Sequence, residues 1–152
     1  MITRLANVET DAPEIMLGVY DFIGRMDFTD CLPEGLEGIE DTVLALVDSD
    51  VVEVAVVEDE DKIIAGLGVA YVPFLWNPAV LQADELFWWG SATQTTAAMR
   101  VLRFTLERMR ERAGDRQAMA VFHKLTSSPA SVAAIYRRLG LREVQTSYMG
   151  LV

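Results

Sequence analysis

The spacing of apolar residues predicts which parts of this chain are helical and which are extended. Apolar positions recur at helical spacing in four segments, the ranges 12–26, 36–47, 96–112 and 129–139. Runs of β-branched and aromatic residues predict strands at 2–6, 51–57, 62–72, 83–89 and 117–125, with one or two more in 142–152. We therefore expect one mixed α/β domain of the α+β type over residues 1–152. Its mostly antiparallel sheet would have six or seven strands, flanked by about four helices.

Turn and cap residues mark where these elements begin and end. Asp11 is the expected N-cap of the first helix, with Pro13 in its first turn. Gly114 and Gly140 follow the last two helices, where a glycine C-cap is common. The segment 73–78 contains two prolines and is expected to be a loop between strands.

Large apolar side chains gather around this predicted loop, in residues 73–82. They are Phe74, Leu75, Trp76, Val80 and Leu81. Such groups in a surface connection usually cover an edge of the core, but a continuous set also suits a docking site. We expect a protein partner or self-association through 73–82 or through the C-terminal strand, since a terminal strand offers an edge for pairing.

Composition limits the class of protein. The 152 residues are 51% hydrophobic, which suits a single domain with a substantial core. The single cysteine, Cys31, excludes an internal disulfide and fits a reducing compartment, and the N-terminus lacks the pattern of a secretion signal. Residues 63–83 are uncharged, but Pro73, Asn77 and Pro78 interrupt them. We expect a cytoplasmic protein without a membrane span.

Charge is divided unevenly along the chain. Residues 1–99 contain 3 basic and 19 acidic side chains, whereas residues 100–152 contain 10 basic and 4 acidic ones. The arginines of the third helix either form its solvated face or meet phosphates or the acidic surface of a neighbouring subunit. Nucleic acid is not an expected partner, because the basic residues are few and lack interleaved aromatic side chains.

The element order and the last helix resemble the GNAT superfamily of acyl-CoA-dependent N-acetyltransferases. Residues 133–141, AAIYRRLGL, are similar to the family's last-helix signature, in which three residues separate a tyrosine from a glycine. The resemblance implies that Tyr136 protonates the departing CoA thiolate. The alternative is a tyrosine that packs beside the sheet with its hydroxyl at the surface.

A second GNAT signature has Gln or Arg, two residues, Gly, one residue, then Gly or Ala, and binds the CoA pyrophosphate. In the best register here it falls on Gln94, Ala97 and Met99, so only the first of three positions matches. A shifted register ends on Arg100, whose side chain could contact phosphate in place of a backbone amide. The implied acyl-CoA site consists of Gln94, Thr95, Thr96, Ala97, Ala98, Met99 and Arg100.

The same reaction needs a base that takes a proton from the amine. Asp84 and Glu85 both lie in the strand before this motif, and strand alternation sends them to opposite faces. We expect Glu85 to be the base, with burial raising its pKa; the alternative is that both are ordinary strand-edge charges. His123 is the only histidine, and we expect no metal site.

Two functions of different classes follow from these observations. The replaced motif favours a structural or interaction protein that keeps the fold but has lost acyl-CoA binding and needs no cofactor. The chain also resembles acetyltransferase-like proteins of tailed bacteriophages, some of which would serve in the particle. The alternative is an active enzyme that transfers acetyl from acetyl-CoA to a small amine or a protein amino group.

Overall fold

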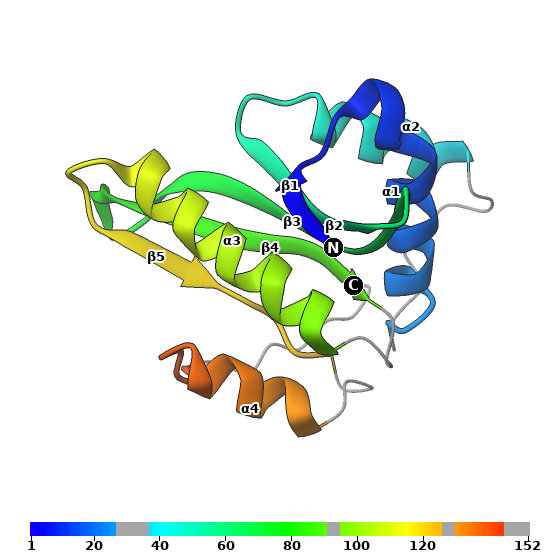
Figure 1. The fold of residues 1–152 in the computed structure, drawn as a ribbon. Coiled ribbons are helices and arrows are strands. Elements are labelled where there is room, and N and C mark those ends of the chain that lie inside the picture. Colours follow the sequence, from blue (N-terminus) through cyan, green and yellow to red (C-terminus); the bar gives the residue numbers. More distant parts are fainter. Residues whose placement is uncertain (27–36, 91–94, 126–129, 145–152) are drawn as a thin grey trace, which may run out of the picture.

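The computed structural model describes residues 1–26, 37–90, 95–125 and 130–144. Within them the chain forms one five-stranded sheet and four helices (Figure 1). The elements in chain order are β1 (Ile2–Leu5), α1 (Val8–Ile23), α2 (Glu37–Val47), β2 (Val52–Asp59), β3 (Lys62–Phe74), β4 (Asn77–Gly90), α3 (Thr95–Ala113), β5 (Ala118–Val121) and α4 (Ala130–Arg138).

The sheet follows chain order, β1-β2-β3-β4-β5. β1 to β4 are antiparallel neighbours, whereas β5 runs parallel to β4 because the helix α3 connects them. The predicted mixed, mostly antiparallel sheet with about four helices is confirmed. Among the described residues the strand number is five and not six or seven; most of the last predicted strand, 145–152, lies outside them.

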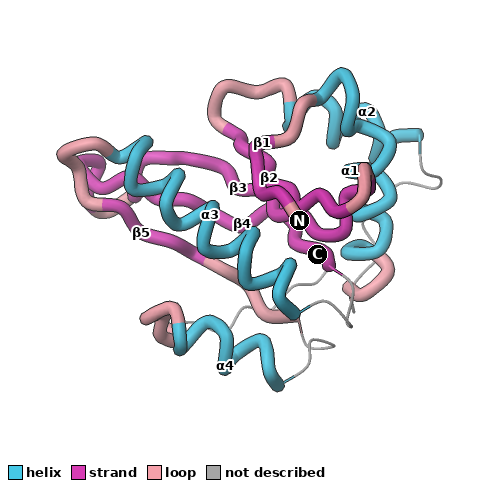
Figure 2. The backbone as a smooth tube through the Cα atoms, in the orientation of Figure 1, coloured by secondary structure: helices cyan, strands magenta, loops and turns pink. Residues whose placement is uncertain are grey.

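Two hydrophobic clusters lie on opposite faces of this sheet. α3 and α4 cover one face, where Leu67, Val101 and Leu102 are fully buried. α1 and α2 cover the other, around Ile15 and Val56. Figure 1 shows these two layers of helices, and Figure 2 shows α4 on the β5 side of α3.

The connection between β3 and β4 is shorter than predicted. The two strands form a long hairpin whose turn is only Leu75 and Trp76, so the predicted loop at 73–78 is wrong. The register shifts at this end, from Pro73 opposite Leu81 to Phe74 opposite Asn77. Prolines are tolerated here because the regular ladder is already interrupted.

The N-terminus of α1 also differs from the prediction. Its N-cap is Asn7, whose side chain accepts a hydrogen bond from the backbone N–H of Glu9. The predicted cap, Asp11, lies within the helix and accepts from the backbone N–H of Asn7 at 2.7 Å. Pro13 is therefore inside α1 and not in its first turn.

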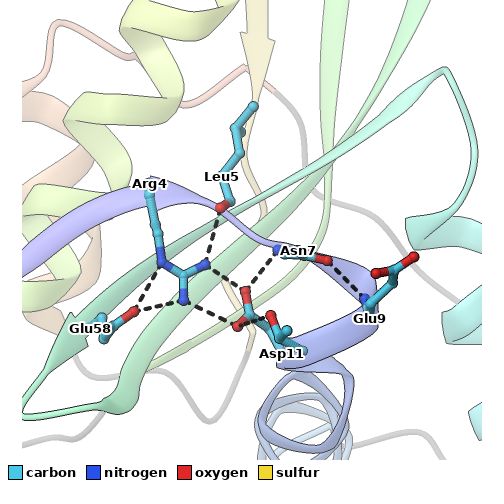
Figure 3. Close-up of polar contacts among 7 residues, drawn as sticks. Arg4, Leu5, Asn7, Glu9, Asp11 and Glu58 are labelled. Carbon is cyan, nitrogen blue, oxygen red and sulfur yellow. Dashed lines mark hydrogen bonds and ion pairs between the residues drawn. The ribbon is translucent and has the colours of Figure 1, made fainter.

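Arg4 connects this helix to the sheet, as Figure 3 shows. Its guanidinium donates to the carboxylates of Asp11 and Glu58, at shortest distances of 2.6 Å each. Asp11 is buried, and the hydrogen bonds from Arg4 hold the pKa of its carboxyl below the usual value. β1, β2 and the start of α1 are thus joined by one side chain.

The uneven charge is partly neutralised within the molecule. Arg108 and Arg112 of α3 both donate to Oε1 of Glu53 on β2, at 3.0 Å. Burial raises the pKa of Glu53, but the two arginines outweigh it, and the net effect is a lowered pKa. Arg112 also lies over the ring of Tyr71, 4.5 Å from its centroid. The predicted solvated arginine face therefore includes internal ion pairs with the acidic part of the chain.

Candidate active site

An irregularity in β4 decides which side chains share a face at the centre of the sheet. Gly68 pairs with Phe87, but the next β3 residue, Val69, pairs with Glu85, which leaves Leu86 as an extra residue. This is a β-bulge, and it shifts the alternation of side chains by one position. Glu85 and Trp88 consequently lie on the α3 and α4 face, where both reach Tyr136.

β4 and β5 separate beside Glu85. Their pairing runs from Leu81 opposite Ala118 to Asp84 opposite Val121 and ends there, although β4 continues to Gly90. Glu85 is therefore the first β4 residue past the paired region. A sheet that opens between two parallel strands leaves backbone groups that need other partners.

Side chains replace the lost ladder bonds at this opening. The backbone N–H of His123 donates to Oε2 of Glu85 at 3.1 Å. The hydroxyl of Tyr136 lies 2.9 Å from the carbonyl oxygen of His123 and 3.3 Å from Oε2 of Glu85. Because a phenol has one proton to donate, it serves one of these two acceptors at a time. Glu85, Tyr136 and the backbone of His123 thus form a small closed network.

The environment of Glu85 suits proton transfer near neutral pH. Its side chain is 7% exposed, and burial raises its pKa to about 7. Hydrogen bonds from His123 and Tyr136 and the charge of Arg25 act in the opposite direction, but burial dominates. Burial and the adjacent carboxylate raise the pKa of Tyr136 well above its ordinary value, so its hydroxyl stays protonated.

Aromatic rings enclose this network. The ring of Tyr136 stacks on Phe122 at 5.7 Å between centroids and meets Trp88 at 6.0 Å, tilted by 37°. All three side chains are half-buried and pack against the α3-side core. Apolar walls of this kind reduce the local dielectric constant and strengthen the polar contacts inside them.

The first turn of α3 contains most of the residues predicted to bind the cofactor. Thr95 and Thr96 are exposed, and the turn contains no acidic residue that would repel an anion. Ala97 is fully buried, so its methyl group lies within the core and leaves the exposed side of the turn clear. Ala98 and Met99 are half-buried. Backbone amides in the first turn of a helix are not used within the helix and are a common site for anions.

Arg100 and Gln94 complete the predicted cofactor residues. Arg100 is exposed, and its Nη1 donates to the backbone oxygen of Met1 at 3.2 Å. Gln94 lies outside the described residues. Of the two residues that replace motif glycines, Ala97 is buried and Met99 is half-buried.

A groove on the opposite face leads from the end of α1 towards the sheet. It has a volume of about 400 Å³, within the usual range for ligand pockets. Arg25 lies at this groove, donates to the backbone oxygen of Trp88 at 3.0 Å, and is close enough to Glu85 to lower its pKa. The residues that line the groove are Glu14, Leu17, Gly18, Asp21, Arg25, Ile63, Ile64, Trp89 and Gly90.

The predicted contact residues are divided between surface and core. Leu75 and Trp76 are 77% and 82% exposed at the hairpin turn. Phe74 and Val80 are half-buried, and Leu81 is 6% exposed within the core, where it is not available for contact. The surface that remains for docking is therefore the tip formed by Leu75 and Trp76.

Some participants in the network were not apparent from the sequence. His123 contributes its backbone, while its imidazole is exposed. Trp88 was expected only as an apolar strand residue, and nothing in its spacing distinguishes it from Trp89.

Within the described residues, no group of three or more metal-binding side chains occurs. None of the described helices has the length and apolar character needed to cross a membrane.

Comparison with known proteins identifies the fold. No family model and no curated protein matches the chain. Solved structures do match: a GNAT family acetyltransferase from Staphylococcus aureus is 16% identical, with 99% of this chain and 98% of that one covered and a TM-score of 0.66. A ribosomal-protein-alanine N-acetyltransferase from Brucella melitensis is 10% identical over both full chains, with a TM-score of 0.69.

An aminoglycoside acetyltransferase from an uncultured soil sample is also similar. It is 15% identical, with 99% of this chain and 97% of that chain covered and a TM-score of 0.69. Identities this low establish similarity of fold and leave function to be argued from the site. The chain therefore has the GNAT acetyltransferase fold.

Proposed function

We propose that this protein is an acetyl-CoA-dependent N-acetyltransferase. The observation that carries the proposal is the buried Glu85 carboxyl, with a pKa of about 7, hydrogen-bonded to Tyr136 where β4 and β5 separate. Burying a carboxyl costs stability, and perturbed carboxyls in such positions are concentrated at functional sites. A fold used only for contact has no need of this arrangement.

The network can perform both proton transfers of an acyl transfer. As the amine nitrogen bonds to the thioester carbonyl carbon, Glu85 accepts the proton that the nitrogen loses. As the carbon–sulfur bond breaks, Tyr136 gives its proton to the departing thiolate. Because the hydroxyl of Tyr136 lies 3.3 Å from Glu85, the proton held by the carboxyl can then return to the phenol. The amide and free CoA leave, and both residues regain their starting state.

The remaining residues would position the two substrates. The first turn of α3, from Thr95 to Met99, would hold the CoA pyrophosphate at its amides, with Arg100 beside it. The groove along α1 would admit the amine from the opposite face. Glu14 in that groove favours a cationic acceptor, whereas Asp21 is paired with Arg25 at 3.1 Å.

Titration with acetyl-CoA tests this proposal. We expect micromolar binding by calorimetry and a melting temperature that rises with the logarithm of ligand excess, because ligand bound only by the folded state adds about 2.7 kcal/mol at 100 times Kd. Free adenosine serves as a control that lacks the pyrophosphate and the thioester. Absence of binding at millimolar acetyl-CoA would refute the proposal that this protein is an acetyltransferase.

A contact role in an assembly, such as a phage particle, is the second candidate. The exposed Leu75 and Trp76 at the hairpin tip favour it, since large aromatic groups are common at interface centres. Size-exclusion chromatography with light scattering should then show self-association that Trp76→Ala weakens at least tenfold. Leu17→Ala, which removes another exposed apolar side chain, from α1, is the control. A monomer that neither variant alters would contradict this role.

A further inference from the structure

The indole of Trp88 contains a buried hydrogen-bond donor that no described group satisfies. Its Nε1 is hidden from solvent and has no hydrogen-bond partner among the residues that the structure describes. Indole is a donor only, so this N–H cannot be satisfied in another way. Orphaned buried donors are rare in native proteins, and each needs a physical explanation.

The position of this donor relates it to the candidate active site. The bulge in β4 places Trp88 on the same face as Glu85, and its ring meets that of Tyr136 at 6.0 Å. On the strand itself, the backbone oxygen of Trp88 accepts from Arg25 at 3.0 Å, which fixes this part of β4. The Trp88 ring therefore lies beside Tyr136, on the same face of the sheet as Glu85.

Two other buried polar atoms without partners lie elsewhere. Thr105 Oγ1 borders a void under α3 that is too narrow to admit water. Arg108 Nε belongs to a guanidinium whose other nitrogens already donate to Glu53 and Glu111. Both atoms lie around the void that Val69 and Tyr71 also line. Of the three, only the indole N–H of Trp88 belongs to a side chain whose ring contacts Tyr136.

We propose that Trp88 contacts the acyl donor directly, its indole N–H donating a hydrogen bond to the thioester carbonyl oxygen; this rests on the proposed acetyltransferase function. That oxygen gains negative charge as the amine adds to the carbonyl carbon, and a fixed donor in a site shielded from water stabilises it. The neighbouring Tyr136 serves the sulfur of the same thioester. The two adjacent rings would thus act on the two atoms whose charge changes.

Phenylalanine at position 88 tests the role of the N–H without removing the aromatic ring. We expect Trp88→Phe to lower kcat about 100-fold to 1,000-fold, with little change in KM for acetyl-CoA, because the bond strengthens as the oxygen becomes charged. Without ligand, the variant should melt at the same or a higher temperature than the parent, since an unsatisfied donor is gone. Tyr20→Phe, which removes the α1 hydroxyl that donates to Oε1 of Glu40 at 2.8 Å, is the matched aromatic control and should change neither kcat nor KM.

The indole resonances give a readout that does not depend on turnover. The chain has three tryptophans, and their ¹H–¹⁵N indole signals can be assigned through bonds in the unaltered protein. The Trp88 signal should move downfield with acetyl-CoA and much less with CoA, which lacks the thioester carbonyl. If acetyl-CoA binds and that signal stays in place, or Trp88→Phe retains full kcat, Trp88 is only a packing residue. If acetyl-CoA does not bind, the proposed function fails, and this inference with it.

Discussion

Replacing Glu85 by glutamine is expected to abolish most acetyl transfer and, at the same time, to stabilise the fold above neutral pH. A positioned general base contributes roughly 10²–10⁴-fold to rate, so kcat should fall by about that factor. The parent enzyme should show a kcat that rises with pH through about 7, since the base must be deprotonated. The glutamine variant should lack this rise.

The effect on stability follows from the same raised pKa. A carboxyl with a pKa of about 7 when folded and 4.5 as its ordinary value favours the folded state below pH 4.5 and loses that contribution as pH rises through 7. The free energy of unfolding decreases by about 3 kcal/mol as a result. Urea unfolding at pH 4 and pH 8 should therefore show Glu85→Gln gaining stability over the parent only at pH 8.

Asp84→Asn provides the control for this experiment. Asp84 neighbours Glu85 on β4 but is half-buried, and its carboxylate accepts from Nε2 of Gln82 at 2.7 Å. Asp84 lies outside the network, so Asp84→Asn should keep kcat within a few-fold of the parent value. If Glu85→Gln keeps the parent's activity and pH profile, Glu85 is not the base.

Alanine at Gly66 is expected to cause the largest loss of stability among conservative substitutions. A methyl group there would lie 2.1 Å from Cη2 of Trp89, and one at Gly18 of α1 would lie 2.1 Å from Cε2 of the same ring. Trp89 is 6% exposed and lies between these two glycines. Overpacking of this kind costs about 1–3 kcal/mol or more. For a domain of this size, that lowers the melting temperature by about 2–4 °C per kcal/mol.

Gly90→Ala separates this clash from the general effect of adding a methyl group. A Cβ at Gly90 would lie 3.5 Å from Cβ of Ala65, an ordinary contact, so its melting temperature should stay close to the parent's. Combining Gly66→Ala with Trp89→Leu should restore part of the loss, as a double-mutant cycle would measure. Strict additivity of the two changes would argue against the clash as the cause.

Most of the fold was predictable because local sequence and burial agree. α3 shows this best: its apolar stripe at Val101, Leu102 and Met109 is buried, and Gly114 follows it with a φ of 59°. The cap of α1 was not predictable by the same means. Asn7 and Asp11 are both good caps, and the contact of Asp11 with Arg4 depends on the folded sheet.

The sequence indicates two residues of the candidate site but not how they are arranged in space. Glu85 and Tyr136 were identified separately, one from strand alternation and one from a resemblance to a helix signature. They meet across the backbone of His123, and a backbone partner leaves no trace in residue identity. The bulge could not be predicted either. Residues 86–89 are all large and apolar, so there is no alternation of polar and apolar residues that a bulge would interrupt.

That bulge has a consequence for how the site can change during evolution. Leu86 is the single residue by which β4 exceeds its partner strand at this point. Without it, the residues that follow would exchange faces, and Trp88 would move away from Glu85 while Trp89 left its place between the glycines. The length of one strand thus determines its chemistry, so a one-codon insertion or deletion would remove the site even if every other residue were kept.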